Sequence, residues 1–143
     1  MIKEVNKKYL NEIVKLHYKS IVPMWLKLGR ERDKKGIIDY MNYTFKNGKV
    51  FGYFLNDKLV GCIGIVADKK FKYAEVEHVL VDEKYQKRGI GREMMEFIED
   101  YAKKNLKIKI KELRLTVLCK NPAVTFYEKM GYTKKSYTMI KKV

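Results

Sequence analysis

The sequence predicts a mixed α/β domain whose first half is largely antiparallel. Two observations lead to this prediction. Segments with apolar residues at every second position, typical of strands, alternate with segments whose apolar residues recur every three or four positions, typical of helices. Two of the strand-like segments, residues 50–55 and 58–67, flank the dipeptide Asn56-Asp57, which suits a tight hairpin turn because both residue types tolerate positive φ.

The N-terminal elements follow from the apolar spacing. A short strand over residues 2–5 precedes a helix over residues 7–19. The apolar face of that helix holds Leu10, Ile13, Val14 and His17. Residues 20–35 show no periodicity and are expected to be irregular. A second helix over residues 34–45 is expected to stop at Asn47-Gly48, a pair that suits a left-handed turn.

The middle of the chain holds the two clearest elements. Residues 73–81 predict a strand, and residues 90–105 predict a long amphipathic helix. The buried stripe of that helix is expected to consist of Ile90, Met94, Phe97, Ile98 and Tyr101.

The remaining segments predict a strand, a helix and a last strand. Residues 111–118 alternate as a strand, and Asn121-Pro122 suits the start of a helix, because Asn caps and Pro fits the first position. Gly131 is expected to end that helix, and residues 132–142 are expected to form the final strand.

Composition bounds the class of protein. The chain has 143 residues, 46% of them hydrophobic, so we expect residues 1–143 to form one domain with one core. No segment approaches the roughly 20 apolar residues of a membrane span, and the first residues hold no apolar signal core. We therefore expect a cytoplasmic protein without a membrane partner. Cys62 and Cys119 lie in apolar runs, which favours buried free thiols over a disulfide or a metal site.

The net charge of +15 raises the question of nucleic-acid binding. Most of the excess is lysine spread along the whole chain, and no recognition motif or series of stacking aromatic residues accompanies it. Solvated lysine-rich faces explain the charge more simply, so we do not expect a nucleic-acid partner. A basic surface would still attract an anionic ligand.

The segment Gln86-x-x-Gly89-x-Gly91 connects the strand at residues 73–81 with the helix at residues 90–105. A strand, a loop with two glycines and a helix start predict a phosphate-binding arrangement, because the first N–H groups of a helix have no internal partner. A dinucleotide-binding fingerprint is disfavoured, since the third glycine and an N-terminal βαβ unit are missing.

A second block, Asn-Pro-Ala-Val-Thr-Phe-Tyr-Glu-Lys-Met-Gly-Tyr, occupies residues 121–132. Together and in this order, the two blocks resemble the acetyl-coenzyme A loop and the second signature of the Gcn5-related N-acetyltransferase (GNAT) family. The resemblance extends over residues 1–132. It implies the acyl-CoA N-acyltransferase fold: a central mixed, mostly antiparallel twisted sheet flanked by helices. The strands at residues 73–81 and 111–118 would splay apart and form a V-shaped cleft for the pantetheine arm.

The resemblance also implies an activity and a set of site residues. It implies transfer of an acetyl group from acetyl-CoA to a primary amine by direct attack in a ternary complex, with no metal. Backbone groups of the strand end and the loop would bind the cofactor, and the side chains of Gln86 and Arg88 would flank its pyrophosphate. The implied cofactor-binding residues are Val79, Leu80, Val81, Gln86, Lys87, Arg88, Gly89, Ile90, Gly91, Arg92, Asn121 and Tyr127.

Three residues are candidates for the proton transfers. Tyr127 matches the family tyrosine that protonates the leaving sulfur, and a phenol with an ordinary pKa near 10 suits that role. Glu75 and Glu77 share one face of their strand by period two, and either would serve as the base. Glu75 matches the family position and is favoured. His78 is expected on the opposite face, as a core residue.

The acceptor is a small-molecule or peptide amine that the sequence does not identify. Met24 and Trp25, in the segment predicted to be irregular, are expected to contact it. Ribosomal-protein acetyltransferases carry a glutamate where this chain has Thr116, which disfavours that substrate. Only residues 133–143 follow the second block, so the acceptor side would be open or completed by a second subunit of a homodimer. The alternative function is a non-catalytic acyl-CoA-binding sensor of the same fold.

Overall fold

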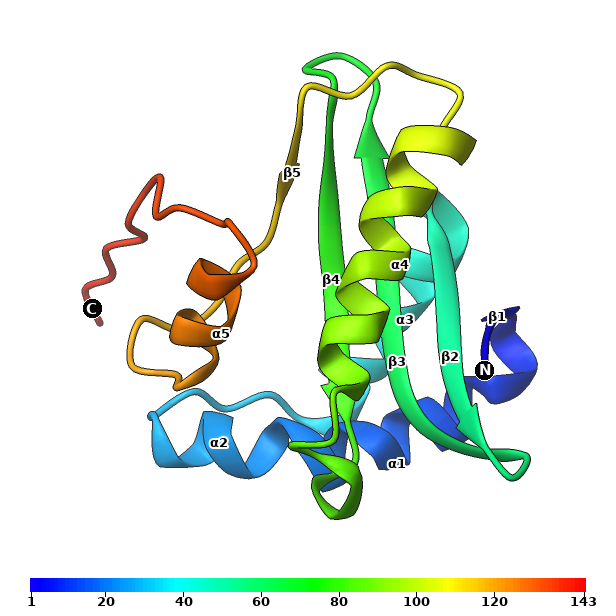
Figure 1. Ribbon diagram of the computed structural model, residues 1–143. Helices are drawn as coiled ribbons and strands as arrows, with labels where there is room; N and C mark the ends of the chain where they lie inside the picture. Colours follow the sequence, from blue (N-terminus) through cyan, green and yellow to red (C-terminus); the bar gives the residue numbers. More distant parts are fainter.

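The computed structural model describes all 143 residues. It consists of a five-stranded sheet with helices on both faces (Figure 1). The strands lie in the order β1-β2-β3-β4-β5; the first four are antiparallel, and β5 runs parallel to β4. The elements are β1 (Ile2–Val5), η1 (Lys7–Tyr9), α1 (Leu10–Ser20), α2 (Val22–Lys27), α3 (Lys34–Asn47), β2 (Lys49–Leu55), β3 (Lys58–Asp68), β4 (Tyr73–Val81), η2 (Glu83–Tyr85), α4 (Ile90–Asn105), β5 (Glu112–Arg114) and α5 (Ala123–Lys129). The predicted mixed α/β fold is confirmed.

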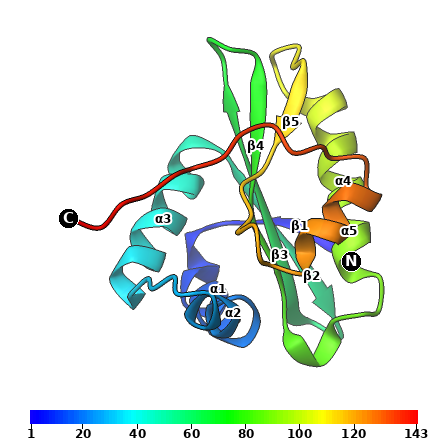
Figure 2. The same cartoon turned by 90° about the vertical axis from the view of Figure 1, so that its left-hand side faces the viewer.

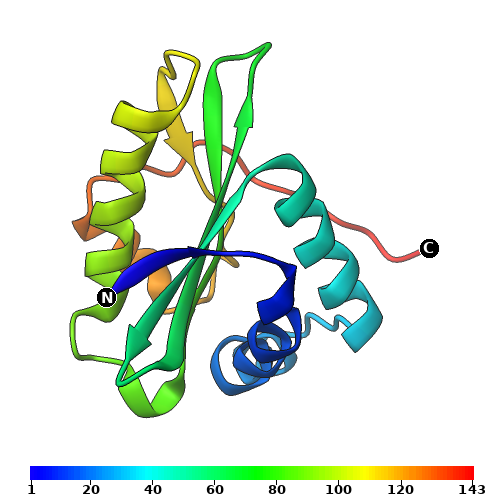
Figure 3. The same ribbon diagram turned by 90° about the vertical axis from the view of Figure 1, so that its right-hand side faces the viewer.

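The sheet separates two apolar layers. Helices α1, α2 and α3 lie on one face and α4 on the other (Figures 2 and 3). The larger buried cluster lies under α4 and includes Ile63, Ile65, Met94 and Ile98. A second cluster, under α1 and α3, includes Ile13, Met41 and Leu80. None of the helices combines the length and the apolar composition that crossing a bilayer requires.

Several predicted bounds are confirmed. The structure places β4 and α4 at the predicted residues. Asn56 and Asp57 both have positive φ, 47° and 62°, and form the predicted tight turn between β2 and β3. Asn121 accepts a hydrogen bond through Oδ1 from the Ala123 N–H at 2.9 Å, and Gly131, with φ of 94°, follows the last turn of α5. These features depend on residues adjacent in sequence, which explains why local rules found them.

Two predictions in the N-terminal half were wrong. Residues 20–35 are not wholly irregular, because Val22–Lys27 form helix α2 with Pro23 in its first turn, a position that needs no N–H donor. Gly48 is not left-handed: its φ is −150°. A Cβ at Gly48 would lie 2.0 Å from the carbonyl oxygen of Ile65, so close backbone approach explains the glycine.

Strand β5 is much shorter than predicted. It pairs with β4 only where Tyr73–Glu75 face Glu112–Arg114, although the alternating pattern continues to Leu118. Beyond Glu75 and Arg114 the two segments of the chain separate, as Figure 1 shows. The outer edge of β4 from Val76 to Val81 therefore has no strand partner.

The predicted final strand is absent. Residues 133–143 have no regular structure and make no backbone hydrogen bond, and the side chains of Tyr137, Met139 and Ile140 are exposed. A strand needs a neighbour with free backbone groups at the right place. This segment reaches β5 through a side chain, in the ion pair of Lys135 with Glu112 at 2.9 Å, and not through backbone hydrogen bonds. The shortening of β5 places Cys119 in an exposed loop, so it is not the buried thiol that was expected. Cys62 is buried, and burial raises the pKa of its thiol to about 12.

Candidate functional site

A β-bulge at His78 interrupts β4 in the middle of the free edge. Its φ is 53°, and the β3–β4 register shifts between Cys62 and Gly64. One extra residue on β4 reverses the alternation of side chains. Glu77 and His78 therefore both face α3, and the prediction that His78 lies on the face opposite Glu77 was wrong. His78 is a buried core residue, as predicted.

The bulge creates a buried polar cluster between β4 and α3. The hydroxyl of Thr44 lies 3.3 Å from Glu77 Oε2 and 2.8 Å from His78 Nε2. The rings of Tyr40 and His78 are 4.3 Å apart between centroids, and the ring of His17 on α1 is 5.5 Å from that of His78. Sequence reasoning missed Thr44 and Tyr40, since their pairing with β4 spans more than thirty residues.

The two candidate bases have different surroundings. The Glu77 side chain is 9% exposed. Burial raises the pKa of Glu77, while hydrogen bonds from Tyr40 and Thr44 oppose the rise. Glu75 lies nearer the surface and accepts a hydrogen bond from Thr116 Oγ1 at 3.4 Å. A base in a cleft benefits from partial burial, because its carboxylate then holds a proton more readily.

We expect the folded state to lose stability as the pH falls below about 6.5. Burial lowers the pKa of His78 from 6.5 to about 3, and it also lowers the pKa of His17. Between these pH values the unfolded chain binds more protons than the folded chain, so protonation favours unfolding, by about 1.4 kcal/mol per pH unit for each such histidine. The raised pKa of Glu77 has the opposite effect: in the pH range where Glu77 titrates, protonation of its carboxylate favours the folded state.

Urea unfolding between about pH 7 and about pH 5 measures this slope. The matched variant His78→Gln lacks one of the two histidines and should show a shallower slope than the wild type. An equal slope in both proteins would contradict the assignment of His78 as a buried neutral histidine.

The loop between β4 and α4 presents backbone donors. Lys87 and Gly89 both have positive φ, 61° and 83°. None of the six consecutive N–H groups from Lys87 to Arg92 donates a hydrogen bond within the protein. Consecutive free N–H groups at the start of a sixteen-residue helix form a site for an anion. The side chains of Lys87, Arg88 and Arg92 add positive charge around it.

The two glycines of this loop have different roles in the fold. Gly89 adopts a left-handed conformation, so a side chain there would be strained although its Cβ would meet no atom. Gly91 has no such constraint. A Cβ at Gly91 would lie 3.7 Å from Phe126 Cζ, an ordinary contact. The fold therefore tolerates a small side chain at Gly91, and the start of α4 lies against α5.

The free edge of β4 is partly occupied by side chains. The Val81 N–H donates to Ser20 Oγ at 3.1 Å, and Gln86 Nε2 donates to the Val81 carbonyl at 2.9 Å. The backbone groups of Val81, and by period two those of Val79, thus point to the open side. Leu80 pairs with Cys62 on β3 and buries its side chain in the core, so it presents no polar group at this edge.

Helix α5 brings Tyr127 to the same region. Val79, Val81, Phe126 and Tyr127 all pack against the cluster beneath α4. Burial raises the pKa of Tyr127 to about 12, and its hydroxyl makes no hydrogen bond within the protein. The structure therefore places a protonated phenol with a free donor on α5, next to Phe126, whose ring faces the start of α4.

The predicted acceptor contacts on α2 have mixed surroundings. Trp25 is largely buried with Val14, Val22 and Ile37, so it contributes to the core. Guanidinium groups of Arg30 and Arg32 lie over its ring, 4.9 and 5.6 Å from the centroid. Met24 is half-buried on the same helix. The expectation that Met24 and Trp25 contact the acceptor stays a prediction.

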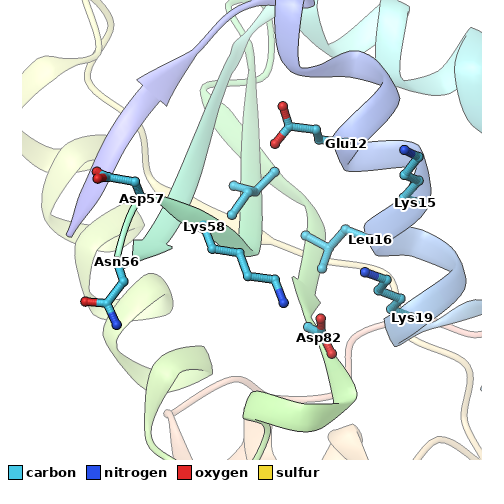
Figure 4. A pocket seen from close by; sticks show the side chains of 9 residues that line it. Glu12, Lys15, Leu16, Lys19, Asn56, Asp57, Lys58 and Asp82 are labelled. Carbon is cyan, nitrogen blue, oxygen red and sulfur yellow. The ribbon is translucent and has the colours of Figure 1, made fainter.

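Two pockets border the sheet. The smaller, about 150 Å³, is lined by Tyr43, Val66, Ala67, Asp68, Tyr73, Glu75 and Glu77. The larger, about 380 Å³, lies between α1 and the β2–β3 turn (Figure 4). Charged side chains of both signs surround the larger pocket, and none of the predicted site residues lines it. The smaller pocket, which both candidate bases line, is the one adjoining the candidate site.

Comparison with known proteins decides the family. Residues 11–132 match the sequence profile of the "Acetyltransferase (GNAT) family". The chain belongs to the GNAT acetyltransferase family. One curated relative of this GNAT chain is "Probable N-acetyltransferase 14" of Xenopus tropicalis, 29% identical over 86 residues. That match covers 59% of this chain and 41% of the relative, so the GNAT chain corresponds to less than half of the relative's length.

Solved structures agree on the fold of this GNAT chain. A "possible acetyltransferase" from Clostridium difficile 630 has a TM-score of 0.77 at 22% identity, covering 100% of this chain and 96% of that one. The ribosomal-protein-S18-alanine N-acetyltransferase of Escherichia coli also has a TM-score of 0.77, at 18% identity, covering 95% and 79%. At these identities the likeness establishes the acyltransferase fold and not the acceptor.

Proposed function

We propose that this GNAT protein transfers an acetyl group from acetyl-CoA to a primary amine. One observation carries the proposal: six free backbone N–H groups at the start of α4 follow an unpaired strand edge, and Tyr127 on α5 packs against the same cluster under α4 as Val79 and Val81 of that edge. A phosphate site, an extended amide edge and a half-buried proton donor are what a bound acyl-CoA requires along its length.

The residues present fit the co-substrate. The N–H groups from Lys87 to Arg92 would hold its pyrophosphate, with Arg88 and Arg92 beside them. The open edge at Val79 and Val81 would pair with the pantetheine amides as an added strand. Ser20 and Gln86, which occupy Val81 in the structure, would have to release it for that pairing.

The chain also supplies both proton transfers. The acceptor must lose a proton before its nitrogen attacks the thioester carbonyl, and we assign the acceptance of that proton to Glu77, the more buried of the two candidate carboxylates. A C–N bond then forms as the C–S bond breaks, and the sulfur leaves with the electron pair. The nitrogen gives up its second proton in this step, and that proton restores the Tyr127 hydroxyl after Tyr127 has protonated the sulfur. The Tyr127 hydroxyl donates a proton to that sulfur, so the products are an acetylated amine and free coenzyme A.

The smaller pocket favours a positively charged acceptor. Its lining includes Asp68, Glu75 and Glu77, and none of these three pairs with a lysine or arginine, although the chain has 32 such residues. Carboxylates left without cationic partners in a strongly basic protein favour an incoming ammonium group. The aromatic ring of Tyr43 suits the same charge, whereas the Arg114 guanidinium already lies over the ring of Tyr73, 3.8 Å from its centroid.

We expect Gly91→Val to weaken coenzyme A binding by at least about tenfold, roughly 1.4 kcal/mol. Its side chain would project where the pyrophosphate approaches the backbone. Gly91→Ala should weaken binding less, while leaving the fold as stable as the wild type or more so, because alanine favours helix. Calorimetric titration with coenzyme A, together with a thermal melt, measures both effects. Unchanged affinity in a folded Gly91→Val protein would contradict the phosphate site.

An array of amines tests the reaction itself. Release of free thiol from acetyl-CoA is followed with monoamines, polyamines and lysine-containing peptides, and the products are checked by mass spectrometry. Acetylation of at least one amine, with preference for those of higher positive charge, is expected. Coenzyme A binding without acetylation of any amine in the array would instead support a non-catalytic sensor.

A further inference from the structure

Thr44 lies at the centre of the polar cluster behind the candidate base. Its side chain is completely buried between α3 and β4. Its hydroxyl contacts three groups: the Tyr40 carbonyl at 3.2 Å, Glu77 Oε2 at 3.3 Å and His78 Nε2 at 2.8 Å. Threonine in a helix commonly donates a hydrogen bond to the carbonyl four residues earlier, and this bond by itself would satisfy the hydroxyl as a donor. The two contacts to β4 are additional.

Proton counting limits the arrangement when Glu77 is ionised. A carboxylate and a carbonyl only accept, and a hydroxyl has a single proton to donate. The Thr44 proton is therefore shared between the Tyr40 carbonyl and Glu77 Oε2, and the Thr44 oxygen is free to accept from His78 Nε2. Because burial keeps His78 neutral, its ring has one N–H, which this arrangement places on Nε2. The chain of donors therefore runs from His78 through Thr44 to Glu77.

Other features of the fold support this series of hydrogen bonds from His78 through Thr44 to Glu77. The bulge is what brings His78 to the same side as Glu77. On β3, a Cβ at Gly64 would lie 3.0 Å from Thr44 Cγ2 and 3.5 Å from His78 Cδ2. A side chain at Gly64 would thus crowd both partners, so the glycine leaves the space that the chain of donors fills.

We propose that Thr44 is a positioning residue, which, backed by His78, holds the Glu77 carboxylate ionised and in place to accept the proton of the acceptor amine. The inference rests on the proposed function, in which Glu77 is the base. Through Thr44, helix α3 would thus take part in the reaction by orienting the base, a role that no residue of the β4–α4 loop or of α5 has.

The other groups around Glu77 set the sign of the expected effect. Burial and Glu75 raise the pKa of Glu77, whereas Tyr40, Thr44 and Arg32 lower it. His78 lies beside Glu77 on β4, and His17 on α1 faces His78. Loss of the Thr44 hydroxyl should therefore raise the Glu77 pKa, so that the carboxylate becomes ionised only at higher pH.

Thr44→Val removes the hydroxyl at nearly constant shape. We expect the acidic limb of its pH–rate profile to move to higher pH, kcat near neutral pH to fall by about tenfold, and coenzyme A affinity to stay unchanged. Thr44→Ser keeps the hydroxyl and should keep the wild-type profile. In a Glu77→Gln background, Thr44→Val should have no further effect on the rate. A Thr44→Val protein with a wild-type profile and only a lower Tm would overturn the proposal.

Nitrogen NMR of the histidine rings gives a readout independent of activity. In the wild type, His78 should carry its proton on Nε2, and in Thr44→Val this preference should weaken. A wild-type His78 protonated on Nδ1 would overturn the proposal even if the valine variant does not fold. If Glu77→Gln itself keeps the wild-type pH–rate profile, the assignment of Glu77 as base is wrong, and the positioning role fails with it.

Discussion

Tyr127→Phe is expected to lower kcat by about 10²-fold, the usual loss when a general acid is removed. Phenylalanine keeps the aromatic ring, and with it the packing against the cluster under α4. The lost hydroxyl makes no hydrogen bond within the protein, so its removal leaves no partner unsatisfied. Because the pKa of Tyr127 is raised to about 12, the phenol is protonated throughout the neutral range and can serve as a donor there.

The neighbouring tyrosine provides the control for this variant. The rings of Tyr132 and Tyr127 are 6.2 Å apart between centroids, and the Tyr132 hydroxyl donates to Glu99 at 3.4 Å. Tyr132→Phe should therefore retain near wild-type turnover. Steady-state kinetics of both variants, with coenzyme A affinity measured by calorimetry, separates the acid from a packing role. If Tyr127→Phe keeps wild-type turnover in an assay in which the chemical step limits the rate, Tyr127 is a core residue and not the general acid.

Glu77→Gln is expected to lower turnover near neutral pH by about 10²-fold. The base works in its ionised form, so wild-type activity should rise as the pH increases through the raised pKa of Glu77. The glutamine variant should lose that limb and recover partly at high pH, where the acceptor is deprotonated in solution. Full pH–rate profiles of both proteins test this expectation.

Glu75→Gln is the matched control for the base. Glu75 lies on the same strand and lines the same pocket, but it lacks the buried partners of Glu77. We expect its profile to stay near that of the wild type, although the family resemblance favoured Glu75. Loss of the acidic limb in Glu75→Gln alone would restore Glu75 as the base. Wild-type profiles in both variants would leave deprotonation to water or to another group.

The sequence by itself determined the elements that depend on neighbouring residues. The bounds of β4 and α4, the Asn56-Asp57 turn and the Asn121 cap follow from periodicity and local hydrogen bonding. The loop with Gly89 and Gly91 belongs to the same class, because six free N–H groups result from one short segment that leads into a helix. The two blocks of family signature could therefore be recognised before any contact was known.

Only the tertiary structure decided the features that depend on residues far apart in the chain. Alternation along β4 cannot predict a bulge, which arises from the pairing of β4 with β3 and moves His78 to the side of Glu77. The choice of Glu77 over Glu75 rests on Thr44, 33 residues away in sequence. Residues 132–142 were predicted as the final strand yet form none, because a strand exists only where a neighbouring backbone offers its donors and acceptors.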